Sequence, residues 1–353
     1  MFHYNRRTVV EIDRYHRQQL LPQIGSSGQR RLAESRVLLI GCGALGSVIA
    51  DQLARAGVGF LRIVDRDLVD WSNLQRQVLF DESHARQAIP KAIAAAQRLH
   101  AINSSITIDA RVSDVQSDTI ESLVRLDAGQ VDLILDGTDN VETRSLINDI
   151  AVKHSVAWVY GACVGIEGRV MPVIPGRTPC LRCIFPEPAD PRELPTCDTA
   201  GVLGPVAAMV ASLQVIAGMR ILLGQAPAEL IRIDGFSPRF HVTDVSSARR
   251  ADCPVCGQRR FDSLEKEPPA GAHLCGRNAV QVSSQDKSGV SLEKIQTRLA
   301  SAGTITRTPH LLRCKLSAEN GVEISVFPDG RAIVHGVSDV PRARSIYARY
   351  IGA

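Results

Sequence analysis

The sequence predicts an α/β fold: a Rossmann-like, doubly wound sheet that is parallel in its N-terminal half and mixed or antiparallel in its C-terminal half, plus a small C-terminal α+β domain. Three observations support this prediction. In the first half of the chain, short apolar runs alternate with helical patterns. A glycine-rich turn follows the first of these runs. Later runs are strand-like and are separated by Gly and Pro, without regular helices between them.

The first unit begins with the apolar run at 36–40 ("RVLLI"), followed by "GCGALG" and by the helical pattern "SVIADQLARAGV". The next run, "FLRIVD", ends at Asp65. Strand, glycine turn, helix and strand form a right-handed βαβ unit whose turn presents backbone N–H groups and a helix N-terminus to a phosphate. A second unit is expected from a helix near 90–101, a strand in "SITIDARV", a helix near 118–126 and a strand leading into "LILDGTDN".

The later part of the chain suggests where the domains divide. The apolar stretch at 206–224 is long enough to be considered as a membrane span, but Gln214 and Arg220 interrupt it, so a buried helix is the better interpretation. The segment "GQRRFDSLEKEPPAGAH" is polar and contains proline, which is typical of a linker. We therefore predict a main domain over 1–262, a linker over 263–275 and a small domain over 276–353.

The small domain contains both strand and helix patterns. "NAVQVSS" predicts a strand, and "SLEKIQTRLASAG" predicts a helix that Ser291 caps and Gly303 stops. "GVEISVFPDGRAIVHGV" predicts a hairpin that turns at Pro-Asp-Gly. "DVPRARSIYARYIG" predicts a closing helix with Pro341 early and Gly352 late.

Composition narrows the class of protein. The chain has 353 residues, 44% of them hydrophobic and 22% charged, and its net charge of +4 is too small to indicate a nucleic-acid surface without a local basic patch, which we do not find. The start, "MFHYNRRTVVEIDRYHRQQLLPQ", lacks the apolar core and cleavage site of a secretory signal. We therefore expect a cytoplasmic protein without nucleic-acid or membrane partners.

The glycine turn predicts an adenosine-containing ligand. Asp65 lies 19 residues beyond Gly46, at the end of the next strand, as in dinucleotide-binding proteins. A nicotinamide cofactor is therefore the default interpretation. It does not account for Asn73, Arg76 and Gln77, which follow in a loop on the ligand side of the sheet and which can grip a triphosphate. A solvated polar turn is the alternative for this loop.

Lys91 is a second indication of phosphate chemistry. It follows Pro90 in the first turn of a predicted helix, where the helix dipole opposes a cation by about 0.3 to 1 kcal/mol. An anion is therefore expected nearby, and a phosphate would serve. Only six lysines occur in the chain, and only Lys91 and Lys153 precede residue 260, so Lys91 is not part of a lysine-rich surface. A solvent-exposed lysine remains the alternative.

The motif "LDGTDN" places Asp136 and Asp139 at the end of another strand, on the ligand side of the sheet. A carboxylate there can hold the Mg²⁺ that accompanies a nucleoside triphosphate. Aspartate is also a common cap and turn residue, so the indication comes from position rather than from residue type.

Two C-x-x-C pairs, Cys180–Cys183 and Cys253–Cys256, can supply four thiolates to a structural Zn²⁺. A redox-active pair is the competing interpretation, but two such pairs occur together and neither opens a helix after a strand. Cys197, in the loop "LPTCDTAGVLGP", is a single thiol that can accept an acyl group or sulfur, although most lone cysteines are inert.

Taken in order, "RYHRQ", "GCGALG", "VDRDLVDWSNLQRQ", "PK", "DGTDN", "GRV", "CLRC", "TCDTAGVLGP" and "CPVC" resemble the MoeB/ThiF/HesA family, bacterial relatives of ubiquitin-activating enzymes. The resemblance covers about Arg14 to Cys256. It implies ATP-dependent adenylylation of the C-terminal glycine of a small β-grasp sulfur-carrier protein, such as MoaD or ThiS, in thiamine or molybdenum-cofactor biosynthesis. It also implies ATP, Mg²⁺ and Zn²⁺ as cofactors, and a sulfurtransferase or cysteine desulfurase as a further partner.

The resemblance also implies roles for individual residues. Asp65 is expected to hold the ribose, Asp139 to bind Mg²⁺, and Cys197 to take part in sulfur transfer. Arg17 is expected to reach the active site of the other subunit of a homodimer. Catalytic roles fall on Arg17, Arg76, Lys91, Asp139 and Cys197. Nucleotide binding falls on Gly41, Gly43, Ala44, Gly46, Asp65, Asp67, Ser72, Asn73, Arg76, Gln77, Lys91, Asp139 and Asn140, and zinc binding on Cys180, Cys183, Cys253 and Cys256.

Two features depart from the family pattern. Ala44 stands where many members have Gly, which is harmless if its φ is negative. The tail lacks the cysteine loop of a rhodanese domain and resembles a short extension found in certain bacterial members. Two other functions stay open at this point: an NAD-dependent Rossmann oxidoreductase, and a zinc-stabilised binding module without activity.

Overall fold

The structure is a computed structural model that describes residues 14–186, 197–267, 271–273, 278–282 and 289–352. The side chains of residues 197, 198, 272 and 273 lie outside this description. The chain divides into two compact units, one made of residues 1–197 and 201–266 and the other of residues 198–200 and 267–353. The predicted domain limits, with a linker over 263–275, stay a prediction.

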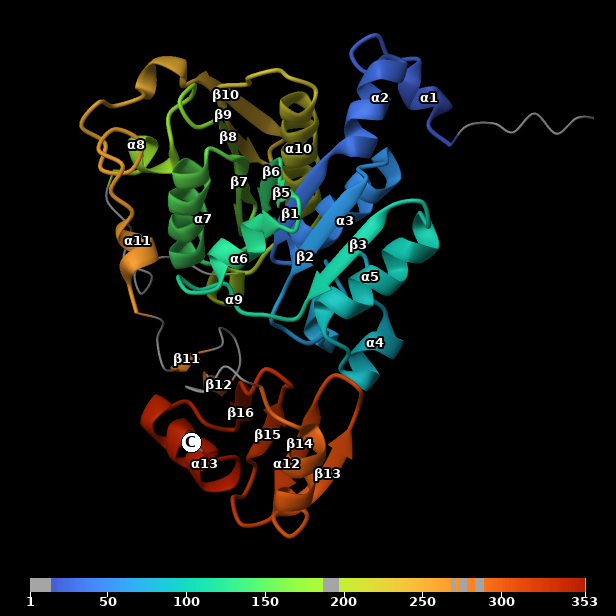
Figure 1. Ribbon diagram of the computed structural model, residues 1–353, viewed down its shortest axis with the longest axis vertical. Coiled ribbons are helices and arrows are strands. Elements are labelled where there is room, and N and C mark those ends of the chain that lie inside the picture. The colour runs from blue at the N-terminus through green and yellow to red at the C-terminus, as the bar shows by residue number, and fades with distance from the viewer. Residues whose placement is uncertain (1–13, 187–196, 268–270, 274–277, 283–288, 353) are drawn as a thin grey trace, which may run out of the picture. The chain divides into compact units, whose positions relative to one another are not determined.

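An eight-stranded mixed sheet forms the centre of the first unit, in the order β10-β9-β8-β7-β6-β1-β2-β3 (Figure 1). The pairs from β3 to β7 are parallel, and those from β7 to β10 are antiparallel, which confirms the predicted change of direction within the sheet. The strands are β1 (Arg36–Ile40), β2 (Phe60–Val64), β3 (Thr107–Arg111), β6 (Leu133–Asp136), β7 (Ala157–Val164), β8 (Glu167–Val173), β9 (Glu229–Asp234) and β10 (Arg239–Asp244).

Helices cover both faces of this sheet (Figure 1). One apolar core lies under α3, α5 and α10, and a second lies under α6 and α7. The two layers follow from the doubly wound topology, because parallel strands are joined by helices that cross over the sheet. The helices of the first unit are α1 (His16–Gln19), α2 (Gly25–Glu34), α3 (Ala44–Ala56), α4 (Glu82–Gln87), α5 (Lys91–Ile102), α6 (Ile120–Val124), α7 (Val141–His154), α8 (Leu181–Ile184), α10 (Gly204–Leu222) and α11 (Asp262–Glu265), with short 3₁₀ turns η1 (Trp71–Asn73) and η2 (Ser246–Ala248). The short helix α9 (Cys197–Ala200) is divided between the two units.

Most elements of the two βαβ units are confirmed. The strand at 36–40 is β1, and the helices expected near 90–101 and 118–126 are α5 and α6. The second of these is shorter than predicted, because the chain leaves the helix to form a two-stranded ribbon, β4 (Arg125–Leu126) with β5 (Gly129–Gln130). The helices α1, α2, α4, α7, α8, α9 and α11 and the hairpin β9–β10 were not predicted.

The apolar stretch at 206–224 is the helix α10. It is the one helix among the described residues that is long and apolar enough to cross a membrane. It packs on α3 and on strands β7 and β8, and Gln214 in its middle is fully buried, where its amide donates to the backbone oxygens of Asp136 and Val159. This packing supports the interpretation of a buried helix, because the amide nitrogen of Gln214 is bonded to the sheet beneath it, while its Oε1 atom has no hydrogen-bond partner among the described residues.

The second unit is an antiparallel sheet, ordered β11-β12-β16-β15-β14-β13, with α12 and α13 packed against it. Ser291 caps α12 through its hydroxyl, and the hairpin turns at Pro-Asp-Gly, as predicted. Gly303 does not stop the helix, which ends at Leu299; instead it opens a strand where a Cβ would lie 1.9 Å from the Lys315 oxygen. The elements are β11 (Gly271–His273), β12 (Ala279–Val282), α12 (Leu292–Leu299), β13 (Gly303–Arg307), β14 (Leu312–Leu316), β15 (Glu323–Val326), β16 (Ala332–His335) and α13 (Val340–Tyr350).

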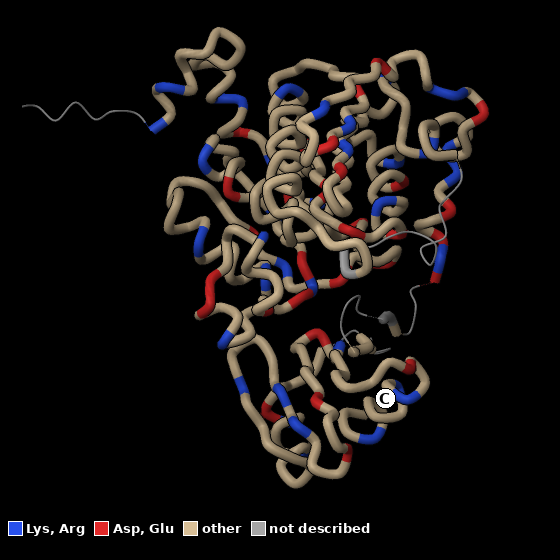
Figure 2. Tube along the Cα trace, turned by 180° about the vertical axis from the view of Figure 1, so that it is seen from behind, with Lys and Arg blue, Asp and Glu red and all other residues tan. Residues whose placement is uncertain are grey.

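Acidic and basic residues are interspersed along both units (Figure 2). Most of their ion pairs are partly exposed and contribute little to stability. Three ion pairs of the first unit are more deeply buried on at least one side: Arg62 with Asp109, Lys91 with Asp67, and Arg144 with Asp136. The last two lie at the candidate site.

Candidate functional site

The candidate site lies at the carboxyl ends of β6, β1 and β2, which are neighbours in the sheet. The chain runs from β1 to β2 and β3 on one side and returns to β6 on the other, so the direction of winding changes between β1 and β6. In open α/β sheets, ligands bind outside the carboxyl ends of the strands at such a switch point. Three hydrogen bonds bring the strand ends together: Gly41 N to the Val64 oxygen, Gly137 N to the Ile40 oxygen, and Cys42 N to Asp65.

Each of the three positions in the turn requires glycine for a different structural reason. Gly41 adopts a φ of +85°, which a side chain rarely tolerates. A Cβ on Gly46 would lie 1.9 Å from the Gly41 oxygen, so this glycine allows α3 to pack against the strand. A Cβ on Gly43 would meet nothing closer than the Gln77 amide at 3.8 Å, so this glycine keeps the ligand side open. Ala44 begins α3 with helical φ, and the departure from Gly is therefore harmless.

Asp65 holds the glycine turn in place. One carboxylate oxygen accepts from Cys42 N at 2.7 Å, and the other accepts from Asp67 N at 2.7 Å. Burial raises the pKa of this carboxyl, and the charge of Lys91 counteracts the shift. Each oxygen retains a second lone pair, so Asp65 can still accept a hydrogen bond from a sugar hydroxyl.

Lys91 is buried at the start of α5, with 6% of its side chain exposed. Its ammonium lies 2.9 Å from Asp67 Oδ2, and its backbone N–H donates to the Asp67 oxygen at 2.9 Å. The anion that offsets the helix dipole is therefore Asp67, and the dipole argument alone does not require a phosphate. The alternative of a solvent-exposed lysine is wrong, because the ammonium is buried. Its charge lowers the pKa of Asp65, at the end of β2, and of Cys42, in the glycine turn, against the effect of burial.

The loop after β2 is organised around Asn73. The side-chain oxygen of Asn73 accepts from Asp70 N at 3.1 Å. The carboxylate of Asp70 in turn accepts from the backbone N–H and from the hydroxyl of Ser72. This capping box fixes the amide of Asn73 and leaves its N–H₂ group able to donate to a ligand. Gln77 is buried close to the glycine turn, and its Oε1 atom has no hydrogen-bond partner among the described residues. Other buried side chains of the protein also have such an atom, so it is the place of Gln77 beside Gly43 that connects it with the site.

Arg76 is half-buried, and its guanidinium donates to the Ser72 oxygen at 2.8 Å. Its backbone packs on the start of α10, where a Cβ on Gly204 would lie 3.3 Å from the Arg76 Cβ. The remaining guanidinium donors are able to bind an anion, because a single neutral acceptor does not saturate the group.

The two aspartates of the loop after β6 have different surroundings. Asp136 is fully buried, and its carboxylate accepts from Thr138 and from Arg144, so it is not a free metal ligand. Asp139 is exposed, and its carboxylate accepts no hydrogen bond from the described residues. Asn140 caps α7 by accepting from Thr143 N at 3.0 Å. Asp139 is therefore the carboxylate in this loop that can bind a cation.

Arg17 does not join these residues within one subunit. It is exposed on α1. The side chains of Gln18 and Tyr15 beside it contact Ala56 and Gly57, at the end of α3. The glycine turn lies at the other end of this 13-residue helix, about 20 Å away. Arg17 can therefore act at a site only if that site belongs to another molecule.

The four predicted zinc ligands form a cluster, with all sulfur atoms within 4.8 Å of one another. The distance from Cys180 to Cys253 is 3.6 Å and that from Cys183 to Cys256 is 3.3 Å. Tetrahedral zinc with Zn–S bonds of about 2.3 Å requires sulfurs about 3.8 Å apart, which these distances approach. Burial raises the pKa of the Cys183 thiol to about 11, so a cation is needed to keep the thiolates together. The donor set thus fits Zn²⁺, with no ligand position left for catalysis.

Cys197 begins α9, but its side chain lies outside the described residues. The predicted role of its thiol therefore stays a prediction.

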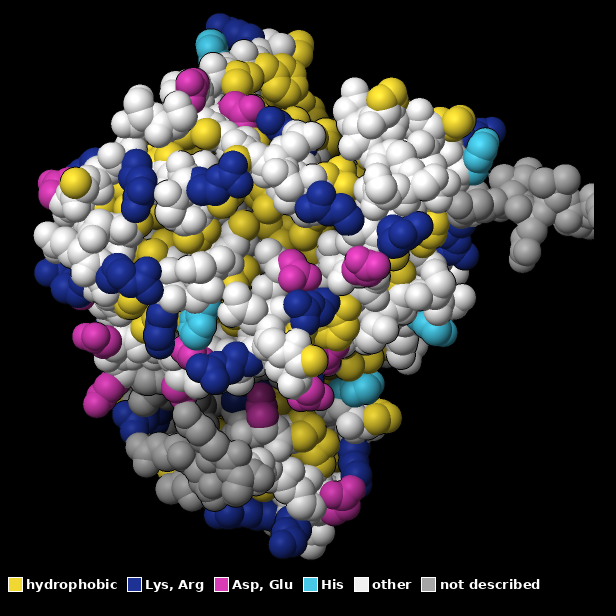
Figure 3. All heavy atoms as spheres, turned by 45° about the horizontal axis from the view of Figure 1, so that its top comes forward, with side chains coloured by type: hydrophobic (Ala, Val, Ile, Leu, Met, Phe, Trp, Pro, Cys, Tyr) yellow, Lys and Arg dark blue, Asp and Glu magenta, His cyan; other side chains and the backbone are white. Residues whose placement is uncertain are grey.

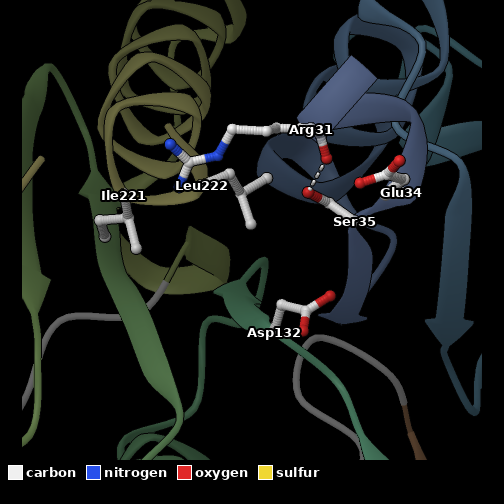
Figure 4. A pocket seen from close by; sticks show the side chains of 6 residues that line it. All are labelled: Arg31, Glu34, Ser35, Asp132, Ile221 and Leu222. Atoms are coloured by element: carbon white, nitrogen blue, oxygen red, sulfur yellow. Dashed lines mark hydrogen bonds between the residues drawn. The ribbon is translucent and has the colours of Figure 1, made fainter. Parts of the chain in front are cut away.

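A separate hollow of about 300 Å³ lies at the opposite end of the sheet (Figure 4). It is lined from α2, from α10 and from the segments that lead into β1 and β6, and the guanidinium of Arg31 reaches toward Leu222 across it. Ser35 and Asp132 stand just before the amino ends of these two strands, whereas the glycine turn follows the carboxyl end of β1. The hollow is therefore distinct from the predicted nucleotide site.

Sequence reasoning missed Arg144. This residue lies in the first turn of α7 with 12% of its side chain exposed, 3.1 Å from Asp136. A cation in the first turn of a helix is opposed by the helix dipole, and this is the signal that singled out Lys91. The same signal was present in "DGTDNVETR".

Comparison with known proteins gives a family and several relatives. The family model described as "ThiF family" matches residues 15–255. A "Sulfur carrier protein ThiS adenylyltransferase" from Bacillus subtilis is 41% identical over 342 residues, which cover 96% of this chain and 99% of the relative. A "SAMP-activating enzyme E1" from Haloferax volcanii is 36% identical over 260 residues, 73% of this chain and 93% of the relative. The match to the Bacillus protein extends over the second unit as well.

Solved structures support the fold. The structure of E. coli MccB with MccA-N7isoASN has a TM-score of 0.60 and 19% identity, covering 69% of this chain and 74% of that one. The structure of E. coli MccB with ATP has a TM-score of 0.59 and 20% identity, covering 70% and 75%. At this identity the likeness concerns the fold alone.

The glycine turn gives a paired prediction. Gly46→Ala is expected to destabilise the protein by more than about 2 kcal/mol, because its Cβ collides with the backbone of Gly41. Gly43→Ala is expected to change stability by less than about 1 kcal/mol but to weaken ATP binding, because its Cβ fills the open side of the turn. Chemical denaturation and calorimetric titration measure the two effects. Equal stability losses in both variants would contradict this assignment of roles.

The cysteine cluster gives a second prediction. We expect the purified protein to contain one zinc per chain, and Cys253→Ser to lose it together with thermal stability, because three thiolates bind zinc more weakly than four. Cys163→Ala, which removes a buried cysteine outside the cluster, is the control and should keep its zinc. Atomic absorption and thermal unfolding are the measurements. A wild-type protein that is stable and free of metal would disprove the zinc assignment.

Proposed function

Because the chain belongs to the ThiF family, we propose that it is an adenylyltransferase that acts on the C-terminal carboxylate of a small sulfur-carrier protein. The observation that carries this proposal is the buried ammonium of Lys91, held beside Asp65 and the glycine turn. A site that binds only the two phosphates of a nicotinamide dinucleotide does not require this cation, whereas a triphosphate does.

The reaction that we propose is a substitution at the α-phosphorus of ATP. A carboxylate oxygen of the carrier's terminal glycine forms the new P–O bond, the bond between the α- and β-phosphates breaks, and pyrophosphate leaves. The carboxylate is already an adequate nucleophile, so no base has to activate it. The protein has to hold the two reactants in line and offset the charge that develops on the phosphate oxygens.

The residues of the site divide this work. The N–H groups at the start of α3 and the guanidinium of Arg76 bind phosphate oxygens, and Asn73 donates to them through its amide. Lys91 donates to these phosphate oxygens, while Asp67 holds the Lys91 ammonium in position. Asp65 accepts a hydrogen bond from the ribose and keeps the glycine turn in place. Ser72 in the capping box of η1, Asn140 as the cap of α7 and Gln77 with its buried amide complete the polar lining.

Asp139 is the residue that would hold Mg²⁺, because its carboxylate is exposed and engaged by no hydrogen bond of the described residues. Oxygen ligands suit this ion, which often binds through one carboxylate together with the phosphates of its substrate. When bound, Mg²⁺ neutralises part of the phosphate charge. The zinc of the cysteine cluster would be structural, joining the segment after β8 to the segment after β10.

We propose a homodimer in which Arg17 of one subunit serves the site of the other. The support is its position at the far end of α3 and the exposure of Leu20 and Leu21 beside it, at 67% and 50%. A second apolar area is available for the carrier: Phe236, Phe240 and Val242 of the β9–β10 hairpin are 52 to 76% exposed. Figure 3 shows apolar side chains gathered on one face of the first unit, between basic ones. Exposed apolar clusters of this kind are typical of protein contacts.

The carrier is proposed to be ThiS-like and to end in Gly-Gly, since the Bacillus relative is named for ThiS. Cys197 remains the proposed acceptor in the later sulfur transfer, with a sulfurtransferase or cysteine desulfurase as donor. A cytoplasmic location would keep its thiol reduced. The family replaces the oxidoreductase interpretation, and the free polar groups of the site argue against a binding module without activity.

Two lysines test the proposal. Lys91→Ala is expected to reduce carrier-dependent ATP–pyrophosphate exchange by about 100-fold or more, because it removes a preorganised cation from the phosphates. Lys153→Ala removes the other lysine that precedes residue 260, which is paired with Glu121 on the surface, and should leave the exchange rate unchanged. Both variants are measured with carriers that do and do not end in Gly-Gly. Folded wild-type protein that exchanges pyrophosphate with no carrier would count against the function, and equal activity of the two variants would count against the site.

A further inference from the structure

The side chain of Arg144 connects three parts of the first unit that are distant in sequence. Its Nε donates to Asp136 Oδ2 at 3.1 Å, and its Nη2 donates to the backbone oxygens of Thr138 at 2.7 Å and of Gly161 at 3.0 Å. The guanidinium also lies over the ring of Tyr160, 5.4 Å from its centre. One cation therefore ties the loop after β6 to the strand β7.

Asp136, at the end of β6, also fixes the loop that follows this strand. Its Oδ1 accepts from both the backbone N–H and the hydroxyl of Thr138, at 2.9 and 2.7 Å. Its backbone oxygen accepts from Gln214 of α10 at 2.8 Å. This arrangement depends on Gly161, because a Cβ there would lie 2.2 Å from the Gln214 side chain. The loop is thus held by contacts with β7 and α10 as well as by its own residues.

These contacts restrain the backbone on both sides of Asp139. Thr138 has its N–H, hydroxyl and carbonyl groups engaged, and Asn140 is fixed as the cap of α7. Between them, the Asp139 carboxylate is exposed and accepts no hydrogen bond from the described residues. A carboxylate with restrained flanks and a free head is the arrangement that binds a cation with little loss of entropy.

The charges lead to the same conclusion. Arg144 neutralises Asp136 in the interior, where an unpaired carboxylate would be costly. The net negative charge of the loop then resides on Asp139, at the surface of the site. Asp139 and Arg144 are close enough for the charge of Asp139 to raise the pKa of Arg144.

We propose that Arg144 is a positioning residue that holds the Asp139 carboxylate in place for the divalent cation of the nucleotide. The inference rests on the proposed function, in which Asp139 holds that cation. Arg144 acts through the loop and touches neither the cation nor the reacting atoms. A lysine cannot replace it, since an ammonium on a flexible stem can pair with Asp136 but does not present a planar fork to two further carbonyl groups.

The test compares Arg144→Lys with Arg62→Lys. Arg62 is a matched control: its side chain is 9% exposed, it pairs with Asp109 at 2.7 Å, and it donates to the backbone oxygens of Leu123 and Arg125, each at 2.8 Å. We expect both variants to lose thermal stability. Only Arg144→Lys should raise the dissociation constant of Mn²⁺, measured by electron paramagnetic resonance with ATP present, by about 10-fold or more. Its pyrophosphate exchange should recover at high Mg²⁺ concentration, which a purely structural defect would not allow.

Asp139→Asn separates this inference from the proposed function. If wild-type protein transfers AMP to a carrier but Asp139→Asn binds Mn²⁺ as tightly as wild type does, the inference is wrong and the function stands. If no carrier is adenylylated although Arg144→Lys weakens Mn²⁺ binding, the function is wrong and the positioning role stands. Should Arg144→Lys fail to fold, Thr138→Ala removes one bond to Asp136 without uncovering a charge, and unchanged Mn²⁺ affinity in that variant would overturn the inference. Equal weakening in Arg62→Lys would also overturn it.

Discussion

The buried ion pair of Asp136 and Arg144 is the constraint on which the geometry of the site depends. A carboxylate that is fully removed from water is stable only when it is paired and hydrogen-bonded, and here Arg144, Thr138 and the backbone of Gly161 supply the partners. Because those partners come from a loop, a helix and a neighbouring strand, satisfying this one charge fixes where β6, β7 and α7 meet. The exposed carboxylate at 139 takes its position from that junction.

The site separates charges that hold the structure from charges that are free for a ligand. Asp136 and Asp67 are engaged by Arg144 and Lys91, and Asp65 is engaged by the backbone of the glycine turn. Asp139, the amide of Asn73 and part of the Arg76 guanidinium remain available. The Lys91 ammonium has both roles, because Asp67 holds it in the position from which we expect it to reach the phosphates. This division explains how a site without a catalytic triad can promote phosphoryl chemistry. Its groups are fixed before the substrate arrives, so little reorganisation is needed when charge develops.

Much of this could be predicted from the sequence, because the signals are local. The βαβ pattern, the three glycines and the two cysteine pairs each follow from spacing, and the structure brings their residues together. The partner of Lys91 could not be predicted in the same way, since Asp67 lies 24 positions away and reaches it only through the docking of α5 on the loop after β2. Arg144 was missed although it breaks the helix-dipole rule as Lys91 does. The position of Arg17 depends on how α1 packs at the far end of α3, which no motif encodes.

We propose that the loops at the carboxyl ends of β1, β2 and β6 are built for a triphosphate with its metal. The most direct measurement is a crystal structure of the full chain with Mg²⁺ and a non-hydrolysable ATP analogue. We expect Lys91 Nζ and an Arg76 nitrogen about 3 Å from phosphate oxygens, and the metal on the carboxylate of Asp139. A nucleotide bound elsewhere, with Arg76 directed to solvent and no phosphate near Lys91, would contradict the account.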